Sequence, residues 1–150
     1  MNAIDFYGWG LPSKAAHLNS FTQDHLRNLA NKLWQMVDSG ALFFILIFVV
    51  IALLGAILYY YPYNNKAGRH YKMRYWTLWL GITALITFAI SAIMGYVLID
   101  SPIKDTTSFI MRISAINLVY SVLLYIVFSI IICNLNMPKT NAYRFFKIGK

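Results

Sequence analysis

The stretch ALFFILIFVVIALLGAILYYY, residues 41–61, decides the fold of this chain. It contains no Asp, Glu, Lys, Arg or His, and neither do two further apolar stretches, residues 75–99 and 113–137. An α-helix needs about 20 such residues to cross a hydrocarbon core about 30 Å thick. A proline follows each stretch and suits the end of a helix. These prolines are Pro62, Pro102 and Pro138.

The three stretches predict an all-α membrane protein with three transmembrane helices. Charged residues make up only 12% of the 150 residues, against about 25% in a typical soluble domain. The segments outside the stretches are too short to build a second core. We therefore interpret residues 1–40 as an N-terminal tail and residues 41–150 as one three-helix membrane domain.

Residues 19–38 of the tail fit an amphipathic helix that precedes the first span. Ser20 followed by Gln23 indicates a capping box, and Asn19 is a second candidate for the cap. Gly40 permits either a bend or one continuous helix into the span. One face is apolar at helical spacing. It comprises Leu26, Leu29, Leu33, Met36 and Val37. The polar face carries acids as well as bases, which favours docking on a partner protein over lying flat on lipid; both stay open.

Aromatic side chains gather in two places. Phe6, Tyr7 and Trp9 lie in a glycine-bearing segment, typical of a turn or extended piece, and should insert into a protein groove or the membrane interface. A second group is expected to anchor at headgroup depth. This group comprises Tyr59, Tyr60, Tyr61, Tyr63, Tyr71, Tyr75, Trp76 and Trp79, with Tyr143, Phe145 and Phe146 as further candidates.

The second stretch carries small residues every three or four positions on one face. They are Gly81, Ala84, Thr87, Ser91 and Gly95. Small residues let helices approach closely in lipid, so we predict a helix-packing interface there, within the chain or between chains. The first stretch has few small residues and is expected to face lipid most.

The third stretch carries polar side chains on one face. They are Ser114, Asn117, Ser121, Tyr125 and Ser129. Polar groups need partners in hydrocarbon. The stripe therefore predicts polar packing against another helix or, as the less favoured alternative, the lining of a water-filled path. Asn117 stands out because an unpaired amide is costly at that depth.

Lys and Arg are unequally distributed between the two sides of the predicted membrane. Eight lie in the first loop and the C-terminal segment: Lys66, Arg69, Lys72, Arg74, Lys139, Arg144, Lys147 and Lys150. Five lie on the other side: Lys14, Arg27, Lys32, Lys104 and Arg112. The positive-inside rule then predicts an outside N-terminus and a cytoplasmic C-terminus. Lipid headgroups and topology account for the net charge of +8 better than nucleic acid does.

The residues that carry chemistry are missing from the predicted spans. They contain no ionisable carboxylate, histidine or base, and the chain has no phosphate-binding loop and no metal-ligand pair. We therefore expect no enzyme, no catalytic residue, no cofactor and no metal. His17, His25 and His70 are expected to be solvated or interfacial, and the single cysteine, Cys133, to be a packing residue.

These observations favour a non-catalytic subunit that anchors, scaffolds or gates a larger membrane assembly, for example a bacterial secretion, injection or transport complex. The expected partners are the lipid bilayer and other membrane subunits or copies of the chain itself, with no nucleic acid and no evident small-molecule substrate. The alternative is a self-assembling homo-oligomeric pore, such as a toxin, a holin-like protein or a defence effector. The expected location is the bacterial inner membrane.

Overall fold

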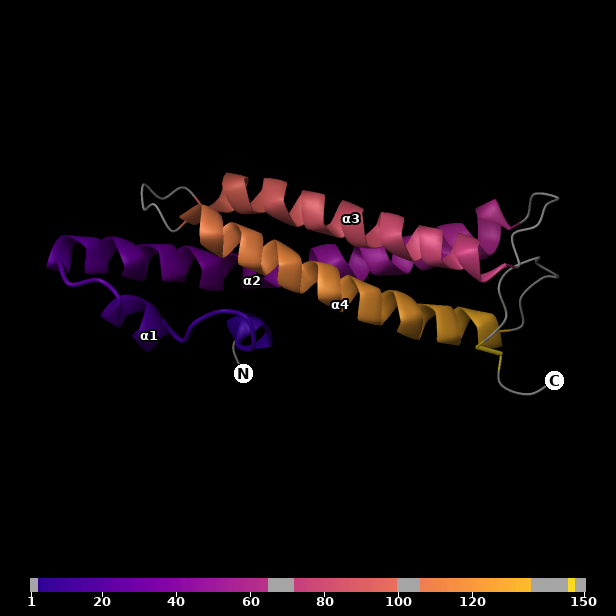
Figure 1. Cartoon of the computed structure of the whole chain (residues 1–150), viewed down its shortest axis with the longest axis horizontal. Coiled ribbons are helices and arrows are strands. Elements are labelled where there is room, and N and C mark those ends of the chain that lie inside the picture. Colours follow the sequence, from indigo (N-terminus) through magenta and orange to yellow (C-terminus); the bar gives the residue numbers. More distant parts are fainter. Residues whose placement is uncertain (1–2, 65–71, 100–105, 136–145, 148–150) are drawn as a thin grey trace. The chain divides into compact units, whose positions relative to one another are not determined.

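The structure, a computed structural model, describes residues 3–64, 72–99, 106–135 and 146–147. Figure 1 shows the helical elements in chain order. They are η1 (Ala3–Tyr7), α1 (Lys14–Asn19), α2 (Asp24–Leu58), η2 (Tyr59–Tyr63), α3 (Met73–Leu98) and α4 (Thr106–Asn134). The described ranges contain no β-strand. The predicted all-α class is therefore confirmed.

Three of these helices are long and apolar enough to cross a membrane: α2 together with η2, α3 and α4. This confirms the predicted number of long apolar helices. Helix α4 begins seven residues before the predicted stretch. The predicted stretch starts after Arg112, whose charge marks the expected edge of the hydrocarbon core, but a helix can extend beyond that edge. Pro62 lies inside η2, whereas Pro102 and Pro138 lie outside the described residues.

Helix α2 runs without a break through Asp38 and Gly40. The expected cap at Asn19 or Ser20 is wrong. Asn19 is the last residue of α1, and Ser20 caps the C-terminal end of that helix, its hydroxyl donating to the His17 carbonyl over 2.6 Å. Ser20 is thus engaged by the helix before it, and α2 starts four residues later, at Asp24.

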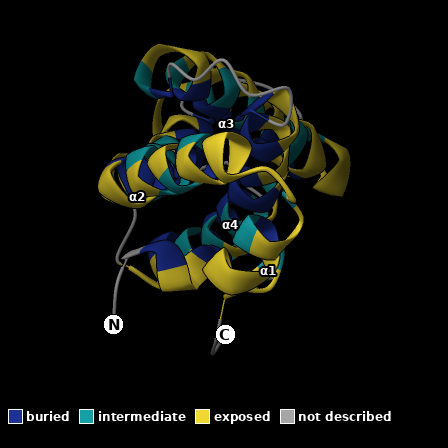
Figure 2. Ribbon diagram, turned by 90° about the vertical axis from the view of Figure 1, so that its left-hand side faces the viewer, coloured by how far each residue is buried: buried dark blue, intermediate teal, exposed yellow. Residues whose placement is uncertain are grey.

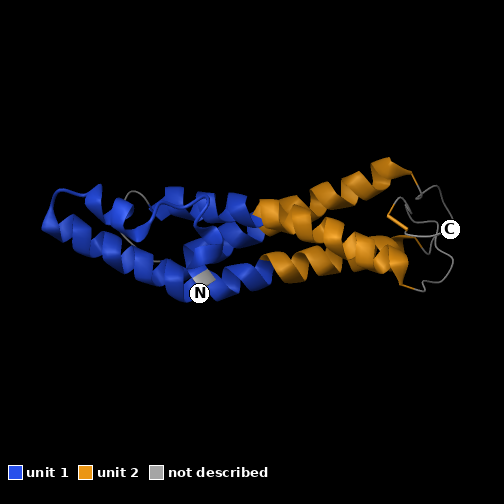
Figure 3. Cartoon of the chain, turned by 90° about the horizontal axis from the view of Figure 1, so that it is seen from below, with its two compact units in different colours: residues 1–47, 88–117 blue, residues 48–87, 118–150 orange. Residues whose placement is uncertain are grey.

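The chain forms two compact units, shown in Figure 3. Unit 1 comprises Met1–Ile47 and Phe88–Asn117. In it, the N-terminal segment lies alongside the first half of α2 (Figure 1). Its largest fully buried side chains include Tyr7, Leu33 and Phe44. Burying these rings and aliphatic groups holds the N-terminal segment on the helices.

Unit 2 comprises Phe48–Thr87 and Leu118–Lys150. Its core is an aromatic cluster in which the apolar rings pack with Ala56 and Ile132. The rings are those of Tyr59, Tyr60, Trp76 and Tyr125. Tyr59 and Tyr60 are almost fully buried, whereas Tyr61 is 41% exposed. The expected headgroup-depth anchors are therefore divided between a packed core and the surface.

Exposed residues lie along all three long helices (Figure 2), and many of them are large and apolar. On α3, Leu85, Ile93 and Val97 are each more than 60% exposed. Such an outer surface suits lipid, in which apolar exposure carries no penalty. The first stretch, expected to face lipid most, is similar in burial to the second: the most apolar window of α2 is 33% buried and that of α3 is 28% buried.

Candidate functional site

A buried amide joins four segments of unit 1. The Asn117 side-chain oxygen accepts from the Tyr7 hydroxyl at 2.9 Å. Its amide nitrogen donates to the Ser91 hydroxyl oxygen at 2.8 Å and to the Phe44 carbonyl oxygen at 3.2 Å. All four residues are at most 1% exposed. We call Tyr7, Phe44, Ser91 and Asn117 the Asn117 node; it satisfies both amide donors and the carbonyl of a side chain that is costly to bury unpaired.

The turn that follows η1 brings Tyr7 to the node. The Gly8 amide donates to the Asp5 carbonyl, and the Gly10 and Leu11 amides donate to the Tyr7 carbonyl. A Cβ on Gly10 would lie 2.6 Å from Cδ1 of Ile116 on α4. A larger residue would press on the end of the Ile116 side chain, so glycine at this position lets the aromatic segment lie close to the helix that carries Asn117. Phe6 and Trp9 are 45% and 61% exposed.

His17 lies in an aromatic box in unit 1. The imidazole is 5% exposed and contacts the rings of Phe21, Trp34 and Phe109, with centroid separations of 5.3, 6.3 and 4.6 Å. The expectation of a solvated or interfacial histidine is therefore wrong for His17, because α1 folds back onto α2 and α4. His25 is exposed, and His70 lies outside the described residues.

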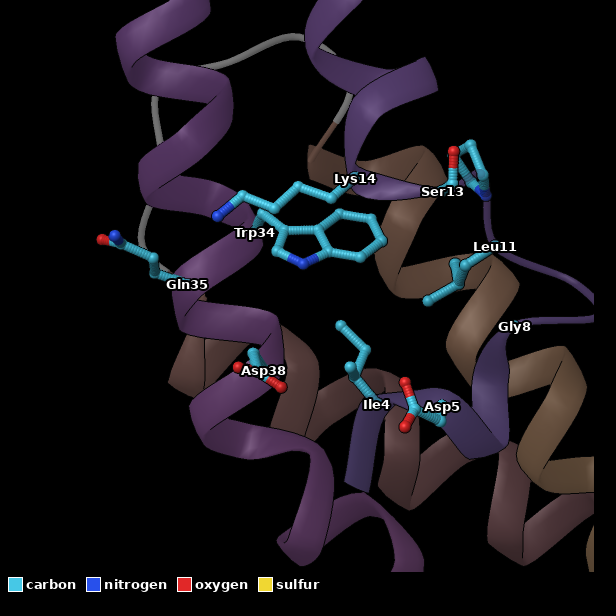
Figure 4. A pocket seen from close by; sticks show the side chains of 10 residues that line it. Ile4, Asp5, Gly8, Leu11, Ser13, Lys14, Trp34, Gln35 and Asp38 are labelled. Carbon is cyan, nitrogen blue, oxygen red and sulfur yellow. The ribbon is translucent and has the colours of Figure 1, made fainter. Parts of the chain in front are cut away.

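A pocket of about 480 Å³ lies in unit 1 between the N-terminal segment and α2. We call it the N-terminal pocket. Its lining includes Ile4, Asp5, Leu11, Lys14, Trp34 and Asp38. Figure 4 shows Lys14 extended beside the Trp34 indole, with the two carboxylates on the other side of the ring in that view. The pocket thus combines both signs of charge with an aromatic face.

The polar stripe of α4 faces the interior of the chain itself. Ser114 and Asn117 are buried in unit 1, and Ser121, Tyr125 and Ser129 are buried in unit 2. Ser114 and Ser121 donate to carbonyls of their own helix, a common arrangement for helical hydroxyls. Among the described residues, the Tyr125 hydroxyl is buried with no hydrogen-bond partner.

The small-residue face of α3 is largely buried. Ala84, Thr87 and Ser91 are at most 7% exposed, and a Cβ on Gly95 would lie 2.6 Å from Cγ2 of Ile110 on α4. Gly81 differs, since a Cβ there would meet no atom within 4 Å in the described part of the chain. Close packing therefore involves this face from Ala84 to Gly95.

The apolar face of α2 is partly used within unit 1. Leu33 and Val37 are at most 1% exposed. Leu29 and Met36 are half-buried, and Leu26 is 36% exposed. The part of this face nearest the first span is covered by the chain itself, and the first turns of α2 remain open.

In unit 2, the Trp76 indole donates to the Ser129 hydroxyl oxygen at 3.1 Å. We expect Trp76→Phe to lower the free energy of unfolding by about 1–2 kcal/mol, from a membrane hydrogen bond of roughly 0.6 kcal/mol and the smaller ring. Titration of the detergent-solubilised protein with SDS measures this change.

Trp79→Phe is the matched control for that substitution. Within the described residues, the Trp79 indole nitrogen is buried with no hydrogen-bond partner. Removing it costs less, because no bond is lost. Equal losses for the two variants would show that the Trp76–Ser129 bond contributes nothing.

The sequence singled out Asn117 as a residue that needs hydrogen-bond partners, but it did not predict which residues those partners are. Ser91 was expected in a packing face and Tyr7 in an aromatic segment, and the Phe44 carbonyl carries no sequence signal. Nor does any pattern mark the N-terminal pocket, whose lining residues come from two separate stretches, residues 4–14 and 34–38. Asp5, Lys14 and Asp38 come to line one pocket only in the folded tail.

The described residues thus form buried hydrogen bonds at the Asn117 node and between Trp76 and Ser129, and they line the N-terminal pocket, which carries both signs of charge. Over the described ranges, no group of three or more His, Cys, Asp or Glu side chains is placed to hold a metal ion. Comparison with family models, with curated proteins and with solved structures gave no match to this chain.

Proposed function

We propose that this chain is a non-catalytic membrane subunit that anchors, scaffolds or gates a larger assembly. The observation that carries the proposal is the use of polar side chains inside the helices for internal bonds. Asn117 bonds three other segments of unit 1, and Ser129 bonds Trp76 in unit 2. What remains outward is an apolar surface suited to lipid and an N-terminal region suited to contact with other proteins.

The contact region in this proposal is the start of α2. Residues 24–28 are exposed at every position, whereas Leu33 and Val37 are turned into unit 1. Leu26 is the exposed apolar side chain there. The apolar face of α2 thus extends beyond the part that is buried in unit 1. In this proposal a partner subunit covers the exposed part around Leu26.

The proposed setting is the bacterial inner membrane, with the N-terminus outside and the C-terminus in the cytoplasm. The Lys and Arg bias between the two sides supports this orientation. Of the first-loop cations, Lys72 and Arg74 lie within the described residues, and Arg74 lies 4.8 Å over the Tyr75 ring. Lys66 and Arg69 lie outside them, as do Tyr71, Tyr143 and Phe145.

The experiment is gentle solubilisation from native membranes, followed by the mass and composition of the intact particle. We expect a heteromeric particle. Leu26→Asp should release the partner, because a charge would enter an apolar contact. Asn28→Asp introduces the same charge on the opposite side of the same turn and should leave the particle intact.

A closed particle made only of this chain, conducting ions in a planar bilayer, would overturn the proposal in favour of the pore. The pore requires the α4 stripe to face a lumen. Burial of all five stripe residues within their units weighs against that arrangement.

A further inference from the structure

We propose that the N-terminal pocket binds the phosphoethanolamine headgroup of a membrane phospholipid. Its lining supplies Asp5 and Asp38 for an ammonium group, the Trp34 indole as an aromatic face and Lys14 for a phosphate. The inference uses the membrane placement proposed above but requires no protein partner.

The pocket matches a zwitterion rather than a single charge. Carboxylates form charge-assisted hydrogen bonds with a primary ammonium, and an indole face attracts the same cation. In the view of Figure 4, the Lys14 ammonium and the two carboxylates lie on opposite sides of Trp34. A headgroup with an ammonium at one end and a phosphate at the other carries the two opposite charges that this lining can oppose.

The depth of the pocket points to lipid. Asp38 is three residues before the apolar stretch that begins at Ala41, a rise of about 4.5 Å along the helix. Asp5 is two residues from Tyr7, whose hydroxyl bonds Asn117 inside the predicted third span. Both carboxylates therefore lie near the level where phospholipid headgroups begin.

Exposed aromatic rings flank the pocket lining. Phe6 and Trp9 adjoin Asp5 and Gly8 in sequence and are 45% and 61% exposed. Aromatic rings at headgroup depth anchor a segment at the interface. A basic side chain from a partner protein would be met by the carboxylates but would leave Lys14 opposed to it, so the mixed lining favours the lipid.

The test is native mass spectrometry of the full-length, detergent-solubilised chain with three lipids of identical acyl chains: phosphatidylethanolamine, phosphatidylcholine and phosphatidylglycerol. We expect phosphatidylethanolamine to bind about tenfold more tightly than either, because only its headgroup combines ammonium donors with a phosphate. The Asp5→Asn and Asp38→Asn variants should each lose most of this preference.

Asp24→Asn is the matched control, since Asp24 is exposed in the first turn of α2 and does not line the pocket. It should bind as the unaltered chain does. Circular dichroism checks that all three variants keep their helix content. Equal binding of the three lipids, or equal behaviour of Asp38→Asn and Asp24→Asn, would overturn the proposal.

Soluble phosphoethanolamine distinguishes a lipid headgroup from a free solute. We expect it to compete with the lipid only at large excess, because it lacks the acyl chains that hold a lipid beside the pocket. Binding as tight as that of the lipid would overturn the assignment to the membrane. The heteromeric particle is a separate readout. Its recovery together with equal binding of the three lipids would leave the proposed function standing while this inference fails.

Discussion

Asn117→Leu will lower the free energy of unfolding by about 2–4 kcal/mol, with most of the loss coming from partners left unpaired. Three hydrogen bonds disappear together: those from the Tyr7 hydroxyl, to Ser91 and to the Phe44 carbonyl. Each membrane hydrogen bond is worth roughly 0.6–1.7 kcal/mol. The Tyr7 hydroxyl loses this acceptor while it stays buried, which adds to the cost.

The measurement is SDS titration in micelles, extended to a double-mutant cycle with Tyr7→Phe. Tyr7→Phe alone should cost about 1 kcal/mol. The double variant should lose less than the sum of the two single losses, because both substitutions remove the same Tyr7–Asn117 bond. Ser114→Ala is the control on the same helix, since among the described residues its hydroxyl bonds only the Ile110 carbonyl of that helix. Additive losses, or an Asn117→Leu loss no larger than that of Ser114→Ala, would show that the hydrogen bonds of the Asn117 node do not stabilise the protein.

Gly95→Ala will destabilise the protein by about 1–3 kcal/mol, whereas Gly81→Ala will leave stability unchanged within about 0.5 kcal/mol or raise it. The added carbon at Gly95 lies 2.6 Å from Cγ2 of Ile110, well inside van der Waals contact. Ile110 is 1% exposed and β-branched, so its side chain has no free rotamer to adopt.

The two glycines form a matched pair because they receive the same substitution on one helix. At Gly81 the new methyl meets no atom within 4 Å in the described part of the chain, so only the gain in helix propensity remains. Thermal unfolding in one detergent compares them directly. Equal effects at the two positions would mean that α3 and α4 are not held as closely as this contact requires.

The sequence predicted what depends on local composition. Long charge-free stretches require helices, so three apolar helices follow from residues 41–61, 75–99 and 113–137 alone. The positions of the helix ends could not be predicted from the sequence. Charged residues mark the edge of the hydrocarbon core, whereas a helix ends where its backbone hydrogen bonds end. Helix α4 thus includes Arg112 and begins at Thr106.

What the sequence could not predict depends on contacts between distant segments. Periodicity placed Gly81 and Gly95 on one face, but whether a neighbour reaches that face depends on how closely the helices approach. His17 was expected near solvent because its nearest sequence neighbours do not enclose it. Its burial comes from Trp34 and Phe109, and the node partner Tyr7 is 110 residues from Asn117.

Because of that separation, the bond between Tyr7 and Asn117 can form only late in the synthesis of the chain. Tyr7 leaves the ribosome 110 residues before Asn117, a wait of about 6 to 22 s at 5–20 residues per second. During that interval the aromatic segment has no acceptor at this position, and the bond forms only when the last long helix is in place. A chain that stalls before Asn117 cannot form this bond. The node is therefore complete only in chains whose synthesis has passed Asn117.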